Sequence, residues 1–325
     1  MIAYLLRRLL LAVPTLIGVN LLLFTLFFVI SSPDDMARAQ LGAKRVTPEA
    51  IERWKADRGY DKPLFWNARA SGSGRFTETI FVQKSARMFL FDFGKSDVGR
   101  DINRELRTRM WPSLALAVPV FLVGLFVAIT LALLLAFLRA TWLDFTGVVI
   151  CVVLMSISSL FYVIAGQYVI ARVWNLVPIS GFADGLDAGR FLALPVAVGV
   201  IAGLGANVRW YRAIFLEEIG KDYVRTARAK GLSEIAVLFR HVLKNGMIPI
   251  LTGTVVVIPS LFLGSLITES FFGIPGLGTF TIEAILMQDF AIVRSMVFIG
   301  SVLYIAGLVL TDLSYTLVDP RVRLQ

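Results

Sequence analysis

Long runs of hydrophobic residues, separated by shorter polar segments, are the dominant pattern along this chain. Six of the runs contain no charged side chain, and each is close to the ~20 residues that an α-helix needs to cross a hydrocarbon core of ~30 Å. We therefore expect six transmembrane helices. They cover residues 9–30, 113–138, 146–171, 191–208, 247–268 and 295–311.

Composition agrees with this pattern. The chain has 325 residues, of which 57% are hydrophobic, and a mean hydropathy of +0.76. A soluble domain has about half of its residues apolar and a more polar average. Lipid must therefore be the solvent for most of this chain, and the sequence predicts an all-α membrane protein.

Lysine and arginine are distributed unequally between the two sides that six spans define. If the N-terminus is cytoplasmic, thirteen basic residues fall in short cytoplasmic segments and three fall in short outer loops. Since positive loops stay on the cytoplasmic side, we expect both termini there. Much of the net charge of +9 then reflects topology and requires no nucleic acid. The thirteen are Arg7, Arg8, Arg139, Arg209, Arg212, Lys221, Arg225, Arg228, Lys230, Arg240, Lys244, Arg321 and Arg323, and the three are Arg172, Arg190 and Arg294.

Residues 31–112 form a long outer loop that carries the remaining sixteen basic residues. One helix is expected in it, because Thr47 is suited to cap a helix that starts at Pro48 and stops at Gly59. The SGSG sequence at residues 71–74 is typical of a flexible tip. A charged, partly helical segment then leads into the second span.

Motifs for catalysis or nucleotide binding are absent from the sequence. It contains no GxxxxGK[ST] loop, so the chain has no P-loop ATPase of its own. His241 is the only histidine and Cys151 the only cysteine, which excludes a His/Cys metal cluster; we expect His241 at the surface and Cys151 packed in a span. The spans also contain no Asp, Glu or His relay of the kind that ion-coupled carriers use. The glycines of GLGANV and GIPGLG are interpreted as packing or turn residues.

Residues 209–246 form the most highly charged short segment, with eight basic and four acidic side chains. Because each charge costs ~2.5 to 3.5 kcal/mol at the centre of a membrane helix, this segment is expected in the cytoplasm. Two short helices are predicted, broken at Gly231, with Ser233 as a cap for the second. In the second helix, Leu232, Ile235, Phe239 and Val242 recur with a helical period and predict a buried face. The residues alone do not distinguish a docking element from an ordinary surface hairpin.

The sequence RTARAKG at residues 225–231, followed by SEIAVLFRHVLKNGMIPI, resembles the cytoplasmic signature loop of ABC importer permeases, often called the EAA loop. The similarity is to the branch that serves oligopeptides, dipeptides and nickel, and to its first-permease type. YLLRRLLLAVPTLIGV, RVTPEAIERWKADRGYDKPL, TESFFGIPGLG and DLSYTLVDPRVR also resemble this branch, so the resemblance covers almost the whole chain.

This resemblance implies a type I ABC importer permease (MetI-like) core at residues 113–316, preceded by an extra N-terminal helix at residues 1–30 and an extracytoplasmic loop at residues 31–112. A cytoplasmic tail is expected at residues 317–325. In the family, the signature loop is a coupling helix that docks in a cleft of the ATPase. Two departures are visible, because Arg225 replaces an acidic residue and His241 and Lys244 stand where Ile and Pro are common. The implied coupling residues are Tyr223, Arg225, Thr226, Ala227, Lys230, Gly231 and Ser233.

The implied protein is a multi-pass subunit of a bacterial inner membrane that imports peptides. Its implied partners are a second homologous permease, two ABC ATPase subunits or domains, and an extracytoplasmic substrate-binding protein. ATP and Mg would be bound by the ATPases, and this chain is expected to hold no cofactor, no metal and no catalytic residue. Two alternatives stay open: the same machine importing nickel or a nickel chelate, and a secondary carrier or membrane scaffold.

The outer loop at residues 31–112 is longer than a connector needs, since most connections run ~2 to 8 residues. Its capped helix and its aromatic residues predict an ordered structure. We expect it to dock the external binding protein through Trp54, Tyr60 and Trp66, while a lid over the outer mouth of the pore is the alternative.

Overall fold

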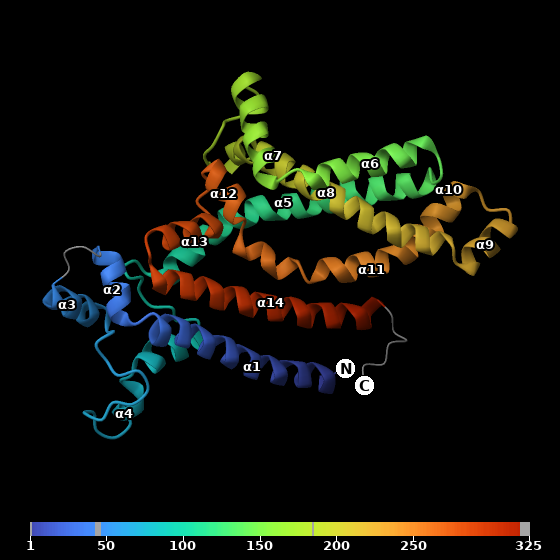
Figure 1. Ribbon diagram of the computed structural model, residues 1–325. Helices are drawn as coiled ribbons and strands as arrows, with labels where there is room; N and C mark the ends of the chain where they lie inside the picture. The colour runs from blue at the N-terminus through green and yellow to red at the C-terminus, as the bar shows by residue number, and fades with distance from the viewer. Residues whose placement is uncertain (1, 43–46, 184, 319–325) are drawn as a thin grey trace.

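A computed structural model describes residues 2–42, 47–183 and 185–318, and these residues form helices joined by loops (Figure 1). Most of the predicted tail at residues 317–325, including Arg321 and Arg323, lies outside the described residues. So do residues 43–46, of which Arg45 and Val46 begin one of the segments that carry the family resemblance. The all-α prediction is confirmed across the described ranges.

Within the part of the chain that the structure describes, five helical segments are long and apolar enough to cross a membrane. Helix α5 packs along α8, and α14 contacts α1 on one side and α11 on the other (Figure 1). These contacts place the long helices roughly alongside one another. The five segments are α1 (Ile2–Phe24) with its π-helical extension η1 (Thr25–Ile30), α5 (Ile102–Phe137), α8 (Ala188–Ile219), the run from α10 (Glu234–Val237) through η6 (Leu238–Leu243) to α11 (Lys244–Val255), and α14 (Phe290–Val318).

Two further apolar segments are sharply bent. Helix α6 (Trp142–Ser156) meets the run of α7 (Ser159–Gly166) and η4 (Gln167–Val173) at 90°. The run of η7 (Ile258–Leu263) and α12 (Leu266–Phe272) meets α13 (Leu277–Leu286) at 70°. The described residues therefore contain five straight candidate spans, or up to seven with the bent pairs, and the predicted number of six lies in this range.

The bends correct two of the predicted spans. The third, residues 146–171, is not one straight helix, because the backbone at Ile157 and Ser158 is extended. The fifth, residues 247–268, is interrupted after Val255, and Gly264 then adopts φ +72°, which a right-handed helix does not allow.

Local capping chemistry explains where several helices begin. Thr47 accepts a hydrogen bond from the Ala50 N–H at 3.3 Å and starts α3 (Pro48–Arg58), which ends at Gly59 with φ +69°, as predicted. Asp101 likewise accepts from the Arg104 N–H at 3.0 Å, so α5 begins well outside its predicted span. Both caps satisfy backbone donors that a helix start leaves free.

The short elements gather at the two ends of the helix array (Figure 1). The outer loop is at one end and contains α2 (Pro33–Leu41), α3, α4 (Gly74–Thr77), η2 (Phe81–Ser85) and η3 (Ala86–Leu90). The opposite end carries α9 (Asp222–Ala229) and α10, together with the beginning of α1 and the end of α14. The predicted coupling segment and outer loop are therefore at opposite ends of the molecule.

Candidate functional site

The predicted coupling segment folds as a compact corner. Helix α9 ends at Ala229 with Lys230 as its C-cap, Gly231 turns the chain with φ +80°, and α10 starts after Ser233. The Ser233 hydroxyl accepts a hydrogen bond from the Ala236 N–H at 3.3 Å, as predicted for its cap. A Cβ added at Gly231 would meet no atom within 4 Å, so the left-handed backbone, not lack of space, is what favours glycine here.

One side of α9 is buried against the membrane-spanning helices. Val224 is fully buried and Ala227 is 4% exposed, and both pack in a cluster with Phe215 and Ile219 of α8 and Val237 of α10. The prediction that Ala227 lies on the docking surface is therefore corrected, because its methyl group packs inside this chain. Because of this packing, a displacement of α9 would be transmitted to α8.

The other side of α9 is exposed and polar. Arg225, Thr226, Ala229 and Lys230 all face outward, and the corner continues through the exposed Gly231. Arg225 forms only a loose ion pair with Asp222, at 3.5 Å between two solvent-exposed side chains. Such pairs contribute little to stability, so Arg225 is free to change partner.

Glu218, near the end of α8, ties α9 to the helix before it. Its carboxylate accepts hydrogen bonds from the Tyr223 hydroxyl and from the Lys221 ammonium group. Burial, and then the hydrogen bond to Glu218, raise the pKa of Tyr223 to about 12. Tyr223 therefore remains a protonated donor whose hydroxyl binds Glu218 of α8, and its predicted role in coupling stays a prediction.

An ion pair closes the corner on the α10 side. Arg228 donates from Nε and Nη2 to the two carboxylate oxygens of Glu234, at 2.8 and 3.0 Å. This paired geometry is more specific than a single contact, because both planar groups are held in register. It fixes the angle between α9 and α10 across Gly231.

The predicted buried face of the second helix is only partly correct. Val242 is buried, but Ile235 and Phe239 are 63% and 57% exposed, while Val237 and Leu238 are buried instead. The reason is the π-helical turn η6, whose wider turn shifts the residues that follow relative to an α-helical period. The expected surface residue His241 is half-buried, with its ring centroid 6.5 Å from that of Tyr223.

A cavity of about 670 Å³ lies between α5, α8 and the α11–α12 segment. Its walls combine apolar side chains with a few polar ones, such as Asn207, Thr254 and Thr268. Five glycines also line it, and they leave the walls without side-chain bulk: Gly124, Gly199, Gly203, Gly253 and Gly264. Gly203 was interpreted from the sequence as a packing or turn residue, and its position at the cavity follows only from the fold. Gly205 does pack closely, since an added Cβ would lie 2.4 Å from the Cys151 carbonyl oxygen.

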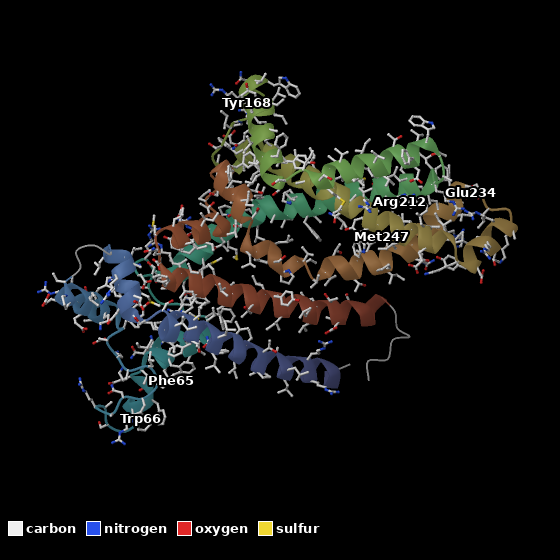
Figure 2. The ribbon with its side chains drawn as sticks, viewed as in Figure 1. Phe65, Trp66, Tyr168, Arg212, Glu234 and Met247 are labelled. Atoms are coloured by element: carbon white, nitrogen blue, oxygen red, sulfur yellow. The ribbon has the colours of Figure 1, made fainter. Side chains whose placement is uncertain are left out.

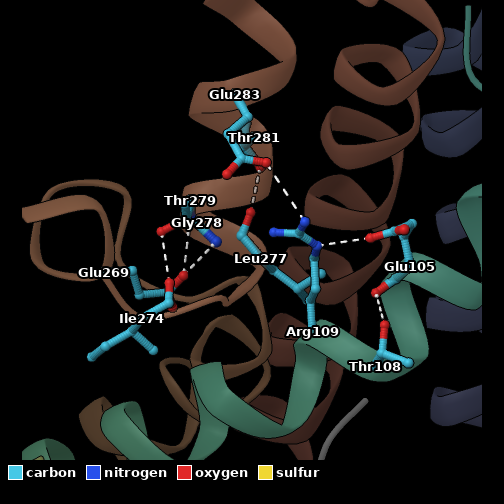
Figure 3. Close-up of polar contacts among 10 residues, drawn as sticks. All are labelled: Glu105, Thr108, Arg109, Glu269, Ile274, Leu277, Gly278, Thr279, Thr281 and Glu283. Carbon is cyan, nitrogen blue, oxygen red and sulfur yellow. Dashed lines mark hydrogen bonds and ion pairs between the residues drawn. The ribbon is translucent and has the colours of Figure 1, made fainter. Parts of the chain in front are cut away.

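A buried carboxylate that the sequence analysis did not single out organises the hairpin between α12 and α13 (Figure 3). Glu269 is fully buried and accepts hydrogen bonds from the backbone N–H groups of Gly278 at 2.7 Å, Thr279 at 3.2 Å and Ser265 at 3.1 Å. Two of these donors belong to the first turn of α13, where a negative charge is favourable. Gly276 leaves room for the carboxylate, because an added Cβ would lie 2.3 Å from Glu269 Oε2.

The same hairpin is fastened to α5 by Arg109 (Figure 3). Its guanidinium group forms ion pairs with Glu105 at 2.8 Å and with Glu283 of α13 at 3.6 Å, and it lies 4.9 Å from the Phe280 ring centroid. In addition, Ser113 of α5 accepts a hydrogen bond from the Leu277 N–H at 2.7 Å. Helices α5 and α13 are therefore held as one unit at this end.

The outer loop is a folded unit with its own core. Trp54 and Tyr60 are each 3% exposed and pack with Phe24 and Phe28 at the end of the first span. Their polar groups are also satisfied, since Trp54 donates to Gln40 at 3.1 Å and Tyr60 donates to Asp97 at 2.9 Å.

These contacts correct the predicted docking surface. Trp54 and Tyr60 cannot present their rings to a partner, because both are covered by the chain itself. Trp66 is 47% exposed and projects from the outer end, far from Glu234 at the opposite end (Figure 2). Its ring packs edge-on against Phe76 at 4.6 Å between centroids. Within the described ranges, no group of three or more His, Cys, Asp or Glu side chains is placed to hold a metal ion.

Comparisons with known proteins give a consistent result. Residues 124–324 match the family model described as the binding-protein-dependent transport system inner membrane component. Residues 1–89 match the model for the N-terminal part of such membrane components. Together the two matches include the outer loop as far as η3, the corner and most of the helix array.

Relatives align along the full chain. A protein of Brucella abortus (strain 2308) named as a peptide transport system permease is 31% identical over 330 residues, covering 99% of each chain. The dipeptide transport system permease protein DppB of Escherichia coli (strain K12) is 29% identical over 350 residues, also with 99% coverage of each. The protein of the same name from Alkalihalophilus pseudofirmus is 27% identical over 354 residues.

Proposed function

Since the chain belongs to the family of binding-protein-dependent transport system inner membrane components, we propose that it is a peptide-conducting permease subunit of an ATP-driven importer. Membership of this family makes the chain a membrane component of a transport system. Peptides are the favoured substrate because the relatives that align over the full chain are named for peptide or dipeptide transport.

The observation that carries the proposal is the two-sided construction of α9. Its outer side offers Arg225, Thr226 and Lys230 to a partner, while Val224 and Ala227 on its inner side pack in the cluster that includes α5 and α8. A partner that moves α9 therefore moves the ends of two membrane-spanning helices. We assign this exposed side as the contact for a cytoplasmic ATPase, of which the importer would hold two copies or two domains.

In the proposed mechanism, the ATPases shift a conformational equilibrium between two arrangements of the spans. ATP and Mg would be bound by the ATPases, and their closure would favour the arrangement of spans that opens outward. This chain contributes no bond chemistry. Its cavity between α5, α8 and α11–α12 would form one wall of the peptide path, and a second homologous permease would supply the opposite wall.

Orientation is part of the proposal. We place α9, the start of α1 and the end of α14 on the cytoplasmic side of an inner membrane, because the basic residues of the short loops concentrate there. The folded outer loop then faces the extracytoplasmic binding protein. Trp66 and its neighbour Phe65, 47% and 52% exposed, are the aromatic residues that we assign to this contact.

The test is reconstitution with the copurifying subunits. Mass spectrometry of the purified complex should identify a second permease and an ATPase, and proteoliposomes that also receive the binding protein should take up a labelled dipeptide only with ATP. Nickel uptake is measured in parallel. Uptake of nickel but not of dipeptide would contradict the peptide assignment, and purification without any ATPase would contradict the importer assignment.

A further inference from the structure

A second cavity, of about 550 Å³, opens at the outer end of the molecule. It lies between the outer loop and the first turn of α14, with walls from the end of α3, from η2 and from the loop after Asp92. Five of its fourteen lining residues are basic and three are acidic. The cavity is thus positive overall and separate from the one between the spans.

Arg294 forms the innermost charge of this cavity. It is 3% exposed, and neither its Nε nor its Nη1 has a hydrogen-bond partner among the described residues. Its guanidinium group lies 4.7 Å from the Phe28 ring centroid and interacts with the Tyr60 hydroxyl and with the charge of Asp97, but Nε and Nη1 are still left without an acceptor. A buried donor without an acceptor costs free energy, so this site favours an incoming anion.

Lys84 is the second cation at this cavity that forms no direct ion pair among the described residues, although the charge of Asp97 acts on it at longer range. Its ammonium group lies 5.1 Å from the Tyr60 ring centroid, and none of the ion pairs among the described residues includes it. Burial, and then the positive charge of Arg294, lower the pKa of Lys84. The two cations therefore repel each other, and an anion between them would relieve that repulsion.

Several of the other charges that line the cavity already have partners, such as Arg87, which pairs with Asp92 at 3.8 Å. Asp97 accepts from the Tyr60 hydroxyl at 2.9 Å and from the Ala291 N–H at 3.2 Å, so its carboxylate is held by hydrogen bonds. Arg58 donates from Nε to the Asp97 carbonyl oxygen at 2.8 Å. This leaves Arg294 and Lys84 as the buried or half-buried cations able to take a new partner.

We propose that this outer cavity binds the C-terminal carboxylate of a short peptide, through Arg294 and Lys84. Its volume suits a small molecule of this size. Only Phe93 and Val98 contribute hydrophobic side chains to its walls, which disfavours lipid acyl chains. Repulsion from the Asp57 and Asp92 carboxylates disfavours a dianion. A zwitterion is compatible with them, because its ammonium group is positively charged. The choice of a peptide as the ligand rests on the proposed function. The inference that Arg294 and Lys84 favour an anion does not.

The experiment measures binding to the full chain in nanodiscs by calorimetry, without binding protein or ATPase. The probes are glycyl-leucine and its amide, glycyl-leucinamide, which lacks the carboxylate. Glycyl-leucine should bind about tenfold or more tightly than the amide, because a charge-assisted contact is lost. Lys84→Gln should weaken binding of glycyl-leucine about tenfold, and Arg294→Gln should weaken it at least as much.

Arg69→Gln is the matched control, since it removes one exposed positive charge from the same loop outside the cavity. It should leave the affinity for glycyl-leucine unchanged. Lys84 is on the loop surface side of the cavity, so its variant remains informative even if Arg294→Gln does not fold. Equal affinity for peptide and amide, or no effect of Lys84→Gln, would overturn the proposal.

Further probes separate other sources of the anion. Displacement of glycyl-leucine by vesicles of anionic lipid but not by acetate would overturn the peptide assignment in favour of a lipid phosphate. Loss of binding-protein affinity in Lys84→Gln, with no peptide binding in any variant, would overturn it in favour of an acidic side chain of that protein. If peptide binds as expected but the assembled transporter takes up none, the proposed function fails and this site stands.

Discussion

Gly231 is the residue on which the direction of the corner between α9 and α10 depends. Its φ of +80° lies in a region that residues with a Cβ rarely adopt, although the space around it is open. Strain at this position therefore comes from the backbone and not from a neighbouring atom. Asparagine tolerates this region better than a β-branched residue does.

We expect Gly231→Val to uncouple ATP hydrolysis from uptake and Gly231→Asn to retain most coupling. The valine would cost on the order of 1 to 3 kcal/mol in the present conformation and would turn α9 away from its partner. Substrate-stimulated ATP hydrolysis and peptide uptake in proteoliposomes measure this. The matched control is Gly189→Val, because Gly189 also has open space around it and does not have a positive φ. Full coupling in Gly231→Val would contradict the assignment.

Ala227 lies on the inner side of α9 and Ala229 on its outer side, so substitutions at these two positions test the two sides independently. Ala227→Leu should lower the free energy of unfolding by ~1 to 3 kcal/mol, because an added side chain must fit in a packed cluster. Ala229→Leu should leave stability nearly unchanged and weaken ATPase binding, since Ala229 is exposed. Thermal unfolding of the isolated chain and copurification of the ATPase provide the two readouts. The assignment of sides fails if the two variants exchange these effects.

At the scale of elements, the sequence predicted what depends on local chemistry. The cap of α3 at Thr47, its end at Gly59 and the Ser233 cap of α10 were all readable, because each needs only nearby residues. The bend after α6 was not, since the residues on both sides of it are equally apolar. The buried face of the helix after Ser233 was misplaced because the π-helical turn η6 changes the period.

The candidate site was predictable to a similar degree. Arg225, Thr226, Lys230 and Ser233 are exposed at the corner, as a docking element requires. The inward positions of Ala227 and Tyr223 depend on α8, and the burial of Trp54 depends on α1, so neither followed from local sequence. Arg294 was counted only as a loop charge, because the cavity that it lines forms from segments far apart in the chain.

The hairpin between α12 and α13 should open when Glu269 is replaced by Gln. The amide group would put N–H donors against backbone N–H donors and leave buried groups unsatisfied, at a cost of ~1 to 3 kcal/mol. Hydrogen–deuterium exchange of a peptide covering residues 273–281 should become faster. Glu283→Gln is the control, because Glu283 makes only a longer ion pair at 3.6 Å. Unchanged exchange in Glu269→Gln would contradict the role of Glu269 in holding the hairpin closed.

The contact between the outer loop and α14 should weaken as pH rises. Burial, and then the charge of Asp289, raise the pKa of Asp97 above its ordinary value of 3.8. The stability contributed by its neutral form is therefore fully present below that value and is lost as pH rises through the raised pKa. Unfolding temperatures measured between about pH 4 and pH 7 should show this decline, and Asp97→Asn should flatten it. The exposed Asp92→Asn serves as control, and an identical decline in Asp97→Asn would contradict the explanation.

At the scale of the whole molecule, the ends of the helix array are chemically distinct. One end holds a folded loop with its own aromatic core, and the other holds a short polar helix fixed to two spans (Figure 1). The family and the helical class followed from the sequence, because hydrophobic run lengths and several motifs act together. How the long loop folds against α1 and α14 did not, since it depends on contacts between distant segments.

Topology gives the prediction at this scale. In a Cys151→Ala background, Ser73→Cys should react only with a membrane-impermeant reagent added from outside, and Ser233→Cys only from the cytoplasmic side. Both serines are exposed, so access depends on the side of the membrane alone. Labelling is followed by mass shift in right-side-out and inverted vesicles. Reaction of both residues from one side would contradict the proposed orientation.

The hydrogen bonds that Glu269 accepts also have a consequence for biogenesis. During synthesis, the carboxylate emerges after the Ser265 donor but before the other two, Gly278 and Thr279, which follow nine and ten residues later. Ser113, which accepts from Leu277, was made 164 residues before that residue, so α5 is already in place when the hairpin arrives. A nascent chain that ends between residues 269 and 278 therefore carries a charge with most of its donors missing. Addition of the first turn of α13 removes that penalty, and the segment from α12 to α13 can insert as a closed hairpin beside α5.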